Sequence, residues 1–305
     1  MRQRLMLIIL IIMASAVFSC GCINDTTPVA PPSKEMNNKE SIPVAVTIPP
    51  YREFAQAIGG DRVTVMVMVP FGASPHTYEP TPRQLKALSE TPLYLAVGTG
   101  IEFEDAWMKK LTLVNPGMNI VDTSKGITLL HTDTGSTSIT DDTIHCDPHA
   151  WLTPSNARVI ARNIADAYST KSPEDAAYFE ARCAAYDAEL KRLDEEITEI
   201  FANTRGKTVL VYHPAWGYYA DRYGLTMIAV EADGKEPSPA TLQTIITTAE
   251  KKGIPVIFAS LESPTRNAQA IADEIGGSVV YISPLADNYT ENLMQVTEAF
   301  RTWAV

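Results

Sequence analysis

Short apolar runs alternate with amphipathic segments along most of the chain, from residue 41 to its end. In the first half, four runs rich in Val, Ile, Leu and Met predict β-strands at residues 43–48, 63–69, 93–98 and 119–122. Apolar residues at helical spacing predict helices at residues 51–60, 81–90 and 103–114. This alternation predicts a mostly parallel four-stranded sheet that is covered by helices on both faces.

The second half of the chain repeats this order. Its apolar runs predict strands at residues 208–213, 226–231, 255–260 and 279–282. The amphipathic segments predict helices at residues 215–224, 238–253, 263–277 and 284–303. We therefore expect two α/β lobes of the same plan. Binding clefts in such folds lie beyond the carboxyl ends of the strands.

Two helical segments separate the halves, at residues 155–170 and 172–204. The second is the longest helical pattern in the chain, and thirty helical residues would be about 45 Å long. A helix of that length spans a whole domain and can join two lobes. The predicted division is an N-terminal lobe at 42–171, a linking helix at 172–204 and a C-terminal lobe at 205–305, with the binding site in the cleft between the lobes.

The N-terminus has the pattern of an export signal. Positive charge in "MRQR" precedes the apolar run "LMLIILIIMASAVF", and the small residues and cysteines of "SCGC" follow. We predict a lipoprotein signal peptide over residues 1–22, with Cys22 as the lipid anchor and Cys20 as the alternative. The competing interpretation is a plain secreted protein. The polar, Pro-rich residues 23–41 are expected to tether the folded part to the outer face of the cell membrane.

The charge excludes one class of function. The 305 residues carry a net charge of -11, whereas nucleic-acid binding requires a surplus of Lys and Arg.

Two cysteines remain beyond the N-terminus, Cys146 and Cys183. In an exported protein they could form a disulfide, and the sequence leaves both a disulfide and free thiols open.

Three of the five histidines stand beside a proline at the end of a predicted strand or before a predicted helix. His76 follows the strand at 63–69, His213 ends the strand at 208–213, and His149 precedes a helix. Neutral imidazoles held by rigid loops of both lobes suit a borderline-soft divalent cation. The competing interpretation is a buried, hydrogen-bonded histidine at each place.

The other two histidines, His131 and His145, lie in a loop rich in Ser, Thr and Asp, and we expect both to be exposed. Cys146 follows His145 directly, and its thiolate is a conceivable ligand, with a disulfide or free thiol as alternatives. The sequence has no P-loop, no GxSxG and no HExxH pattern. Three histidines with a water also fit a zinc hydrolase, but no residue is nominated as its general base.

The motifs "PHTYEPTP", "DPHAWL" and "HPAWGYYADRYGL", in this order, resemble the zinc/manganese solute-binding lipoproteins of ABC transporters, and the resemblance covers about residues 43–303. It implies two α/β lobes joined by a long helix, with metal bound between them by His76, His149 and His213. Histidine at position 213 is similar to the zinc-type members, although some three-histidine members bind manganese. The implied partners are a membrane permease and its ATPase, and we expect a monomer.

The chain departs from that family's pattern in two places. Ser283 stands where many members have an aspartate ligand, and Asp287 is the nearest carboxylate that could replace it, with water as the competitor. The loop before "DPHAWL" is not His-rich, unlike that of many zinc-type members.

We therefore predict a protein that captures Zn²⁺ outside the cell by ligation and release, without enzymatic chemistry. The alternatives are a manganese-binding protein of the same class, a zinc-dependent hydrolase and a surface adhesin.

Overall fold

The computed structural model describes residues 40–131, 146–231, 237–260, 262 and 265–305. The predicted signal peptide, the anchor at Cys22 and His145 lie outside the described residues, as does nearly all of the predicted tether. Within the described part of the chain, no helix has the length and apolar character that would let it cross a membrane.

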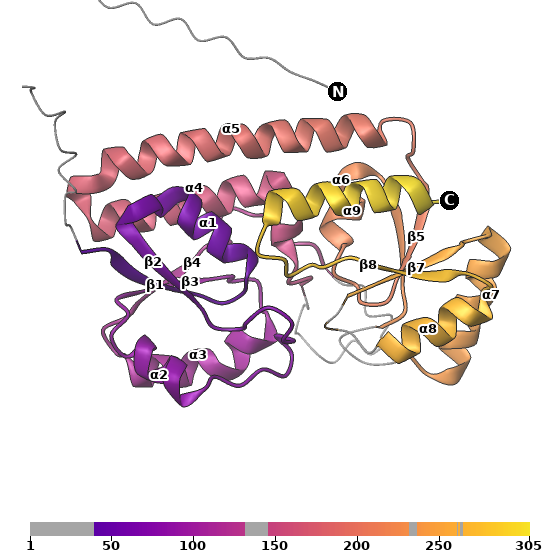
Figure 1. The fold of residues 1–305 in the computed structure, drawn as a ribbon, viewed down its shortest axis with the longest axis horizontal. Coiled ribbons are helices and arrows are strands. Elements are labelled where there is room, and N and C mark those ends of the chain that lie inside the picture. Colours follow the sequence, from indigo (N-terminus) through magenta and orange to yellow (C-terminus); the bar gives the residue numbers. More distant parts are fainter. Residues whose placement is uncertain (1–39, 132–145, 232–236, 261, 263–264) are drawn as a thin grey trace, which may run out of the picture. The chain divides into compact units, whose positions relative to one another are not determined.

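Four parallel strands form the sheet of the first lobe, in the spatial order β2-β1-β3-β4. They are β1 (Ile42–Val46), β2 (Val63–Val67), β3 (Leu93–Ala96) and β4 (Asn119–Asp122). One face is covered by α1 (Pro50–Gly59) and α4 (Pro154–Lys171), and the other by α2 (Pro82–Leu88) and α3 (Glu102–Val114) (Figure 1). All four residues of β3 are buried, because a central parallel strand is covered on both faces.

The sheet of the second lobe repeats this topology, in the order β6-β5-β7-β8, again all parallel. Its strands are β5 (Thr208–Val211), β6 (Thr226–Ala229), β7 (Val256–Ala259) and β8 (Ser278–Tyr281). Its helices are α6 (Gly217–Tyr223), α7 (Pro239–Lys252), α8 (Thr265–Glu274) and α9 (Tyr289–Trp303). Two four-stranded parallel sheets flanked by helices confirm the predicted fold class.

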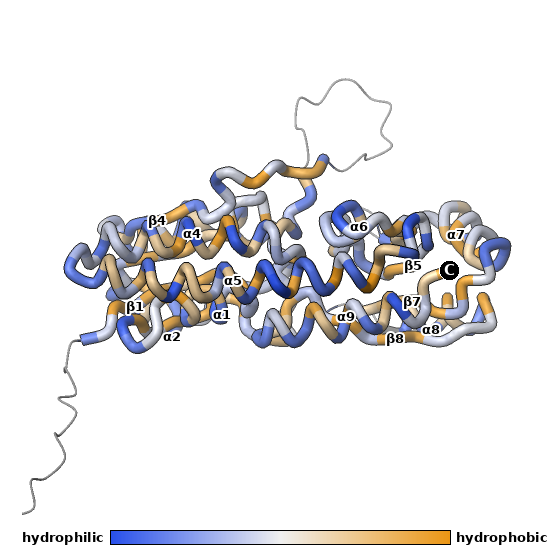
Figure 2. Tube along the Cα trace, turned by 90° about the horizontal axis from the view of Figure 1, so that it is seen from above, coloured by the Kyte–Doolittle hydropathy of each residue, from blue (hydrophilic) through white to orange (hydrophobic). Residues whose placement is uncertain are grey.

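The long helix α5 (Ala176–Phe201) runs along both lobes (Figure 1). Its 26 residues make it about 39 Å long. It packs against α1 and α4 of the first lobe and against α6 and α9 of the second, and Figure 2 shows it between these neighbours. The helix begins four residues later than predicted, because Pro173–Asp175 form a separate 3-10 turn.

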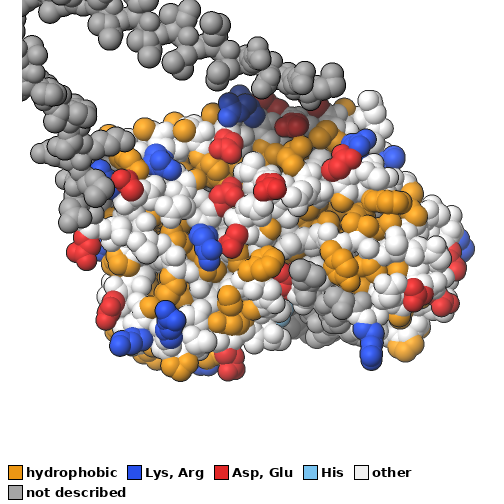
Figure 3. Space-filling model, viewed as in Figure 1, with side chains coloured by type: hydrophobic (Ala, Val, Ile, Leu, Met, Phe, Trp, Pro, Cys, Tyr) orange, Lys and Arg blue, Asp and Glu red, His pale blue; other side chains and the backbone are white. Residues whose placement is uncertain are grey.

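One apolar core continues through both lobes. It contains Val46 of β1, Phe54 of α1, Leu190 of α5 and Phe300 of α9. A second apolar cluster lies between the sheet of the second lobe and helices α7 and α8. Charged side chains of both signs are interspersed with apolar ones on the face in Figure 3, so the acidic surplus does not form one patch there.

Glu53 of α1 caps the N-terminus of α9, a helix of the other lobe. Its carboxylate accepts hydrogen bonds from the backbone N–H of Tyr289 at 2.7 Å and from the hydroxyl of Thr290 at 3.0 Å. The hydroxyl of Tyr186 on α5 donates to the same carboxylate at 2.8 Å. The first N–H groups of a helix have no partner within it, so a residue of the first lobe completes a helix of the second.

The predicted start of α9 at residue 284 was wrong. Pro284 and Leu285 form a turn, in which the backbone N–H of Leu285 donates to the hydroxyl of Ser283 at 3.1 Å, and the helix begins only at Tyr289. Pro284 suggested a first helical turn, but the turn after β8 uses it instead. Asp287 therefore precedes α9 and does not lie in its first turn.

Both cysteines of the described chain are free thiols. Cys183 is buried in α5, and its Sγ lies 3.7 Å from the carbonyl oxygen of Ala161. Cys146 is partly exposed before the entrance to α4. The structure therefore contains no disulfide between them.

Candidate metal centre

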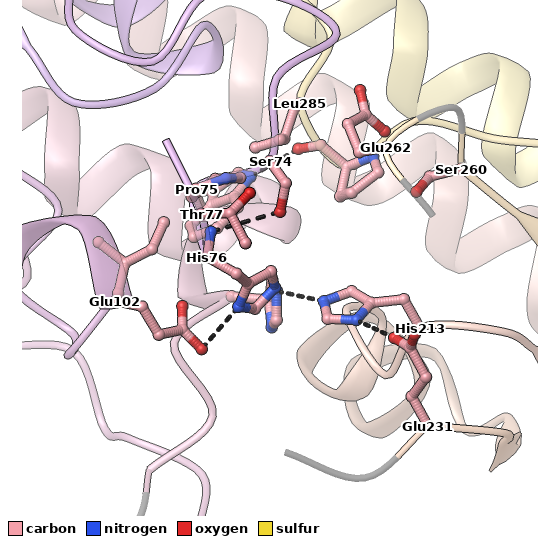
Figure 4. Close-up of a pocket in the computed structure, with 14 residues that line it drawn as sticks. Ser74, Pro75, His76, Thr77, Glu102, His213, Glu231, Ser260, Glu262 and Leu285 are labelled. Carbon is pink, nitrogen blue, oxygen red and sulfur yellow. Dashed lines mark hydrogen bonds and ion pairs between the residues drawn. The ribbon is translucent and has the colours of Figure 1, made fainter. Parts of the chain in front are cut away.

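The fold brings the three predicted histidines together in one cavity. His76 comes from the loop after β2, His149 immediately precedes the 3-10 turn Ala150–Leu152, and His213 follows β5 by two residues. The ring centroid of His213 lies 5.2 Å from that of His76 and 5.1 Å from that of His149. The cavity therefore collects an imidazole from each of three separate chain segments (Figure 4).

Each imidazole has a carboxylate on its Nδ1 atom. The pairs are Glu102 with His76 at 2.8 Å, Asp147 with His149 at 2.8 Å and Glu231 with His213 at 2.9 Å. A neutral imidazole carries one N–H, and a carboxylate accepts it, so in all three rings the lone pair lies on Nε2. Metal-binding histidines are oriented in the same way in proteins.

The Nε2 atoms of His149 and His213 lie 3.3 Å apart. In the tautomer set by Asp147 and Glu231, both atoms present lone pairs, and two acceptors cannot hydrogen-bond to each other. Two nitrogens bound tetrahedrally to Zn²⁺ at 2.0–2.1 Å would be about 3.3 Å apart. The pair thus has the spacing of two ligands of one ion, and a cation between them would remove the repulsion.

The secondary structure and local backbone hydrogen bonds position these three carboxylates. Glu231 follows β6, and its backbone N–H donates to the carbonyl oxygen of Tyr212 at 2.9 Å, which sets it beside His213 in parallel register. The Asp147 carboxylate also accepts the backbone N–H of His149 at 2.9 Å. Glu102 is the first residue of α3.

His76 and His213 differ in their proton affinity. The hydrogen bond to Glu102 raises the pKa of His76 above its ordinary value, against the opposing effect of burial. Burial lowers the pKa of His213, and the hydrogen bond to Glu231 only partly offsets it. For Glu102, burial raises the pKa, but the hydrogen bond and charge of His76 outweigh it and the pKa is lowered.

Asp287 is not among the residues that line the cavity. Its Oδ2 atom forms an ion pair with Nη1 of Arg52 at 3.2 Å, and its Oδ1 atom is buried without a hydrogen-bond partner. Ser283 also lies outside the lining. The cavity does contain another carboxylate, Glu262, whose two oxygens are both buried without a hydrogen-bond partner. Figure 4 shows Glu262 beside Ser260, apart from the rings of His76 and His213.

The described residues contain no three His, Cys, Asp or Glu side chains that are already arranged around one metal position. The spacing of His149 and His213 nevertheless matches two zinc ligands, and the third ring, His76, lies on a loop with 30% of its side chain exposed. A loop side chain at the cavity edge can turn to complete a site that the other two rings begin.

The carboxylate partners were missed in the sequence, although two had detectable signals. Asp147 stands two residues before His149 in "DPH". Glu231 ends one predicted strand and His213 ends another, and neighbouring parallel strands bring their carboxyl ends together. Glu102 had no such signal.

Residues 44–302 match the family model described as ZnuA, zinc-uptake complex component A, periplasmic. The chain belongs to the ZnuA family. It is 26% identical to the zinc-binding protein AdcA of Streptococcus pyogenes serotype M3 over 289 residues, which cover 88% of this chain and 55% of AdcA. It is also 26% identical to the high-affinity zinc uptake system protein ZnuA of Bacillus subtilis, over 90% of this chain and 87% of that protein. The chain thus spans about half the length of AdcA.

Solved structures of the ZnuA family have the same fold. A crystal structure of ZnuA is 36% identical, with a TM-score of 0.82, and the match covers 87% of this chain and 100% of that one. A zinc-bound deletion mutant of ZnuA is 37% identical, with a TM-score of 0.79, over 86% of this chain and 97% of that one.

Proposed function

We propose that this ZnuA-family protein captures Zn²⁺ outside the cytoplasm and delivers it to an ABC permease that an ATPase drives. The observation that carries the proposal is the set of three carboxylate-held imidazoles that turn their Nε2 lone pairs into one cavity. The similarity to zinc-binding AdcA and to zinc-uptake ZnuA supports it. The chemistry is ligation and release, and no bond of a substrate is broken.

The proposed ligands are the Nε2 atoms of His76, His149 and His213. The fourth position has three candidates: water, Glu262 and Asp287. Water needs no rearrangement, because zinc accepts it readily. Glu262 lines the cavity with free oxygens. Asp287, which the sequence suggested, would first have to leave Arg52, so the geometry supports it least.

Zinc is favoured over manganese by the type of donor. Imidazole suits Zn²⁺, whereas Mn²⁺ prefers carboxylate and water oxygens. The test is metal analysis of protein purified without added metal, followed by competition between the two ions. Retained zinc that excess Mn²⁺ does not displace supports the proposal, and preferential retention of manganese contradicts it.

The rival function is a zinc-dependent hydrolase, which would need a general base beside a metal-bound water. Glu102, Asp147 and Glu231 each accept a hydrogen bond from a histidine, so Glu262 is the lining carboxylate that this rival would use. Zinc-loaded protein is expected to leave ester, peptide and phosphate substrates unchanged. Turnover that Glu262→Gln removes would establish the rival.

The site of action follows from the N-terminal pattern. We propose export, lipid attachment at Cys22 and an extended tether that holds a monomer at the outer face of the membrane, where it can meet the permease.

A further inference from the structure

Cys146 and His131 place a thiol and an imidazole in hydrogen-bonding contact, outside the lining of the cavity. The Sγ atom of Cys146 lies 3.7 Å from Nδ1 of His131. The two residues pair in an antiparallel β-bridge, and residues directly opposite in such a pair project their side chains to the same side. The backbone pairing therefore brings the thiol and the imidazole together.

The backbone around this pair is held on both sides. The N–H of Asp147 donates to the carbonyl oxygen of Leu130 at 2.8 Å. The hydroxyl of Tyr218 on α6 accepts the N–H of Leu130 at 3.0 Å and donates to the carbonyl oxygen of Asp147 at 3.1 Å. Residues next to both members of the pair are thus held to one helix, so the fold sets the backbone positions from which the thiol and the imidazole project.

We propose that Cys146 and His131 bind a borderline-soft divalent cation such as Zn²⁺, at a second site independent of the three-histidine cavity. With Zn–S about 2.3 Å and Zn–N about 2.0–2.1 Å, sulfur and nitrogen of a tetrahedral site lie about 3.6 Å apart, close to the observed 3.7 Å. The thiol loses its proton to solvent when the ion binds. His131 is exposed and Cys146 partly so, which leaves the remaining positions to water.

Cobalt(II) distinguishes the two sites, because a thiolate ligand gives an intense charge-transfer absorption that histidine ligands do not. The protein is the full chain with Cys20→Ser and Cys22→Ser, so that Cys146 and Cys183 are its only thiols. We expect this protein to show the thiolate absorption and Cys146→Ser to lose it. In His131→Ala, the Co²⁺ dissociation constant obtained from the thiolate absorption should be at least tenfold higher. Cys183→Ser is the matched control, since that thiol is buried in α5, and it should keep the absorption.

The inference is overturned if the parent protein shows no thiolate absorption or if Cys146→Ser retains it. It is also overturned if His131→Ala leaves the Co²⁺ dissociation constant of the thiolate site unchanged. Binding in the cavity is followed separately through His76→Ala. That variant should weaken the histidine site and leave the thiolate absorption intact, so failure of either site is recognised without reference to the other.

Discussion

The Oδ2 atom of Asp147 occupies the space that a side chain at Gly217 would need, since a Cβ atom there would lie 2.4 Å from it. The same carboxylate holds Nδ1 of His149 through its other oxygen. A methyl group at position 217 must therefore move the carboxylate that orients a proposed ligand.

Gly217→Ala should lower zinc affinity about tenfold or more, which is the usual cost of losing a partner that orients a metal ligand. Competition titration against a zinc chelator would measure it. Gly117→Ala is the matched control, because its Cβ would meet nothing closer than 3.7 Å. Equal affinities of the two variants would contradict the orienting role of Asp147.

Replacing His76, His149 or His213 singly with Ala should each lower zinc affinity at least tenfold, about 1.4 kcal/mol, because each removes one of at most four ligands. His131→Ala should leave the affinity of the cavity unchanged. Calorimetric titration measures all four variants. Unchanged affinity after any one of the three cavity replacements would remove that residue from the site.

Zinc affinity should fall as the pH falls, because protons compete for the Nε2 lone pairs. The hydrogen bond to Glu102 raises the pKa of His76 above the ordinary 6.5, whereas burial lowers that of His213. A raised pKa means protonation at higher pH, so His76 is protonated before His213 as the pH falls.

Glu102→Gln removes the group that raises the pKa of His76 and should shift the onset of this decline to lower pH. Zinc dissociation constants measured between about pH 5 and 8, the range in which histidine titrates, would reveal the shift. An identical pH profile in the variant would argue against a role of this pair in the pH response.

The fourth metal position can be assigned with two isosteric replacements. Asp287→Asn should change zinc affinity less than about threefold, roughly 0.6 kcal/mol, because the Asp287 carboxylate already pairs with Arg52. If the Glu262 carboxylate reaches the ion, Glu262→Gln should lower zinc affinity more than Asp287→Asn does. If water completes the site, the two variants should have equally small effects on zinc affinity. A loss in Asp287→Asn as large as that of a histidine variant would instead restore the ligand that the sequence suggested.

Membrane attachment should depend on Cys22. Cys22→Ser is expected to release the protein from the membrane fraction, with Cys20→Ser as the control that stays attached. Fractionation and mass spectrometry of the mature N-terminus would measure this. Attachment that survives both single replacements would mean that either cysteine serves or that the uncleaved apolar run is the anchor.

The sequence predicted all eight strands of the two sheets, because short apolar runs separated by amphipathic helices leave few other folds open. It also nominated the three histidines, since each stands at the end of a strand or before a helix. It placed the start of the last helix too early, at residue 284, because a proline marks both a first helical turn and an ordinary turn. It also failed to pair carboxylates with imidazoles, because contacts such as that of Glu102 with His76 depend on how segments far apart in the chain pack.

The hydrogen bonds from Tyr289 and Thr290 to Glu53 have a consequence for how the chain folds. The last helix of the chain is completed only when the first helix of the folded part is in place, and the two are more than two hundred residues apart. Together with the apolar core shared by both sheets, this ties the two halves into one cooperative unit. Thermal unfolding should therefore occur in a single transition, and neither half should be a stable protein when expressed without the other.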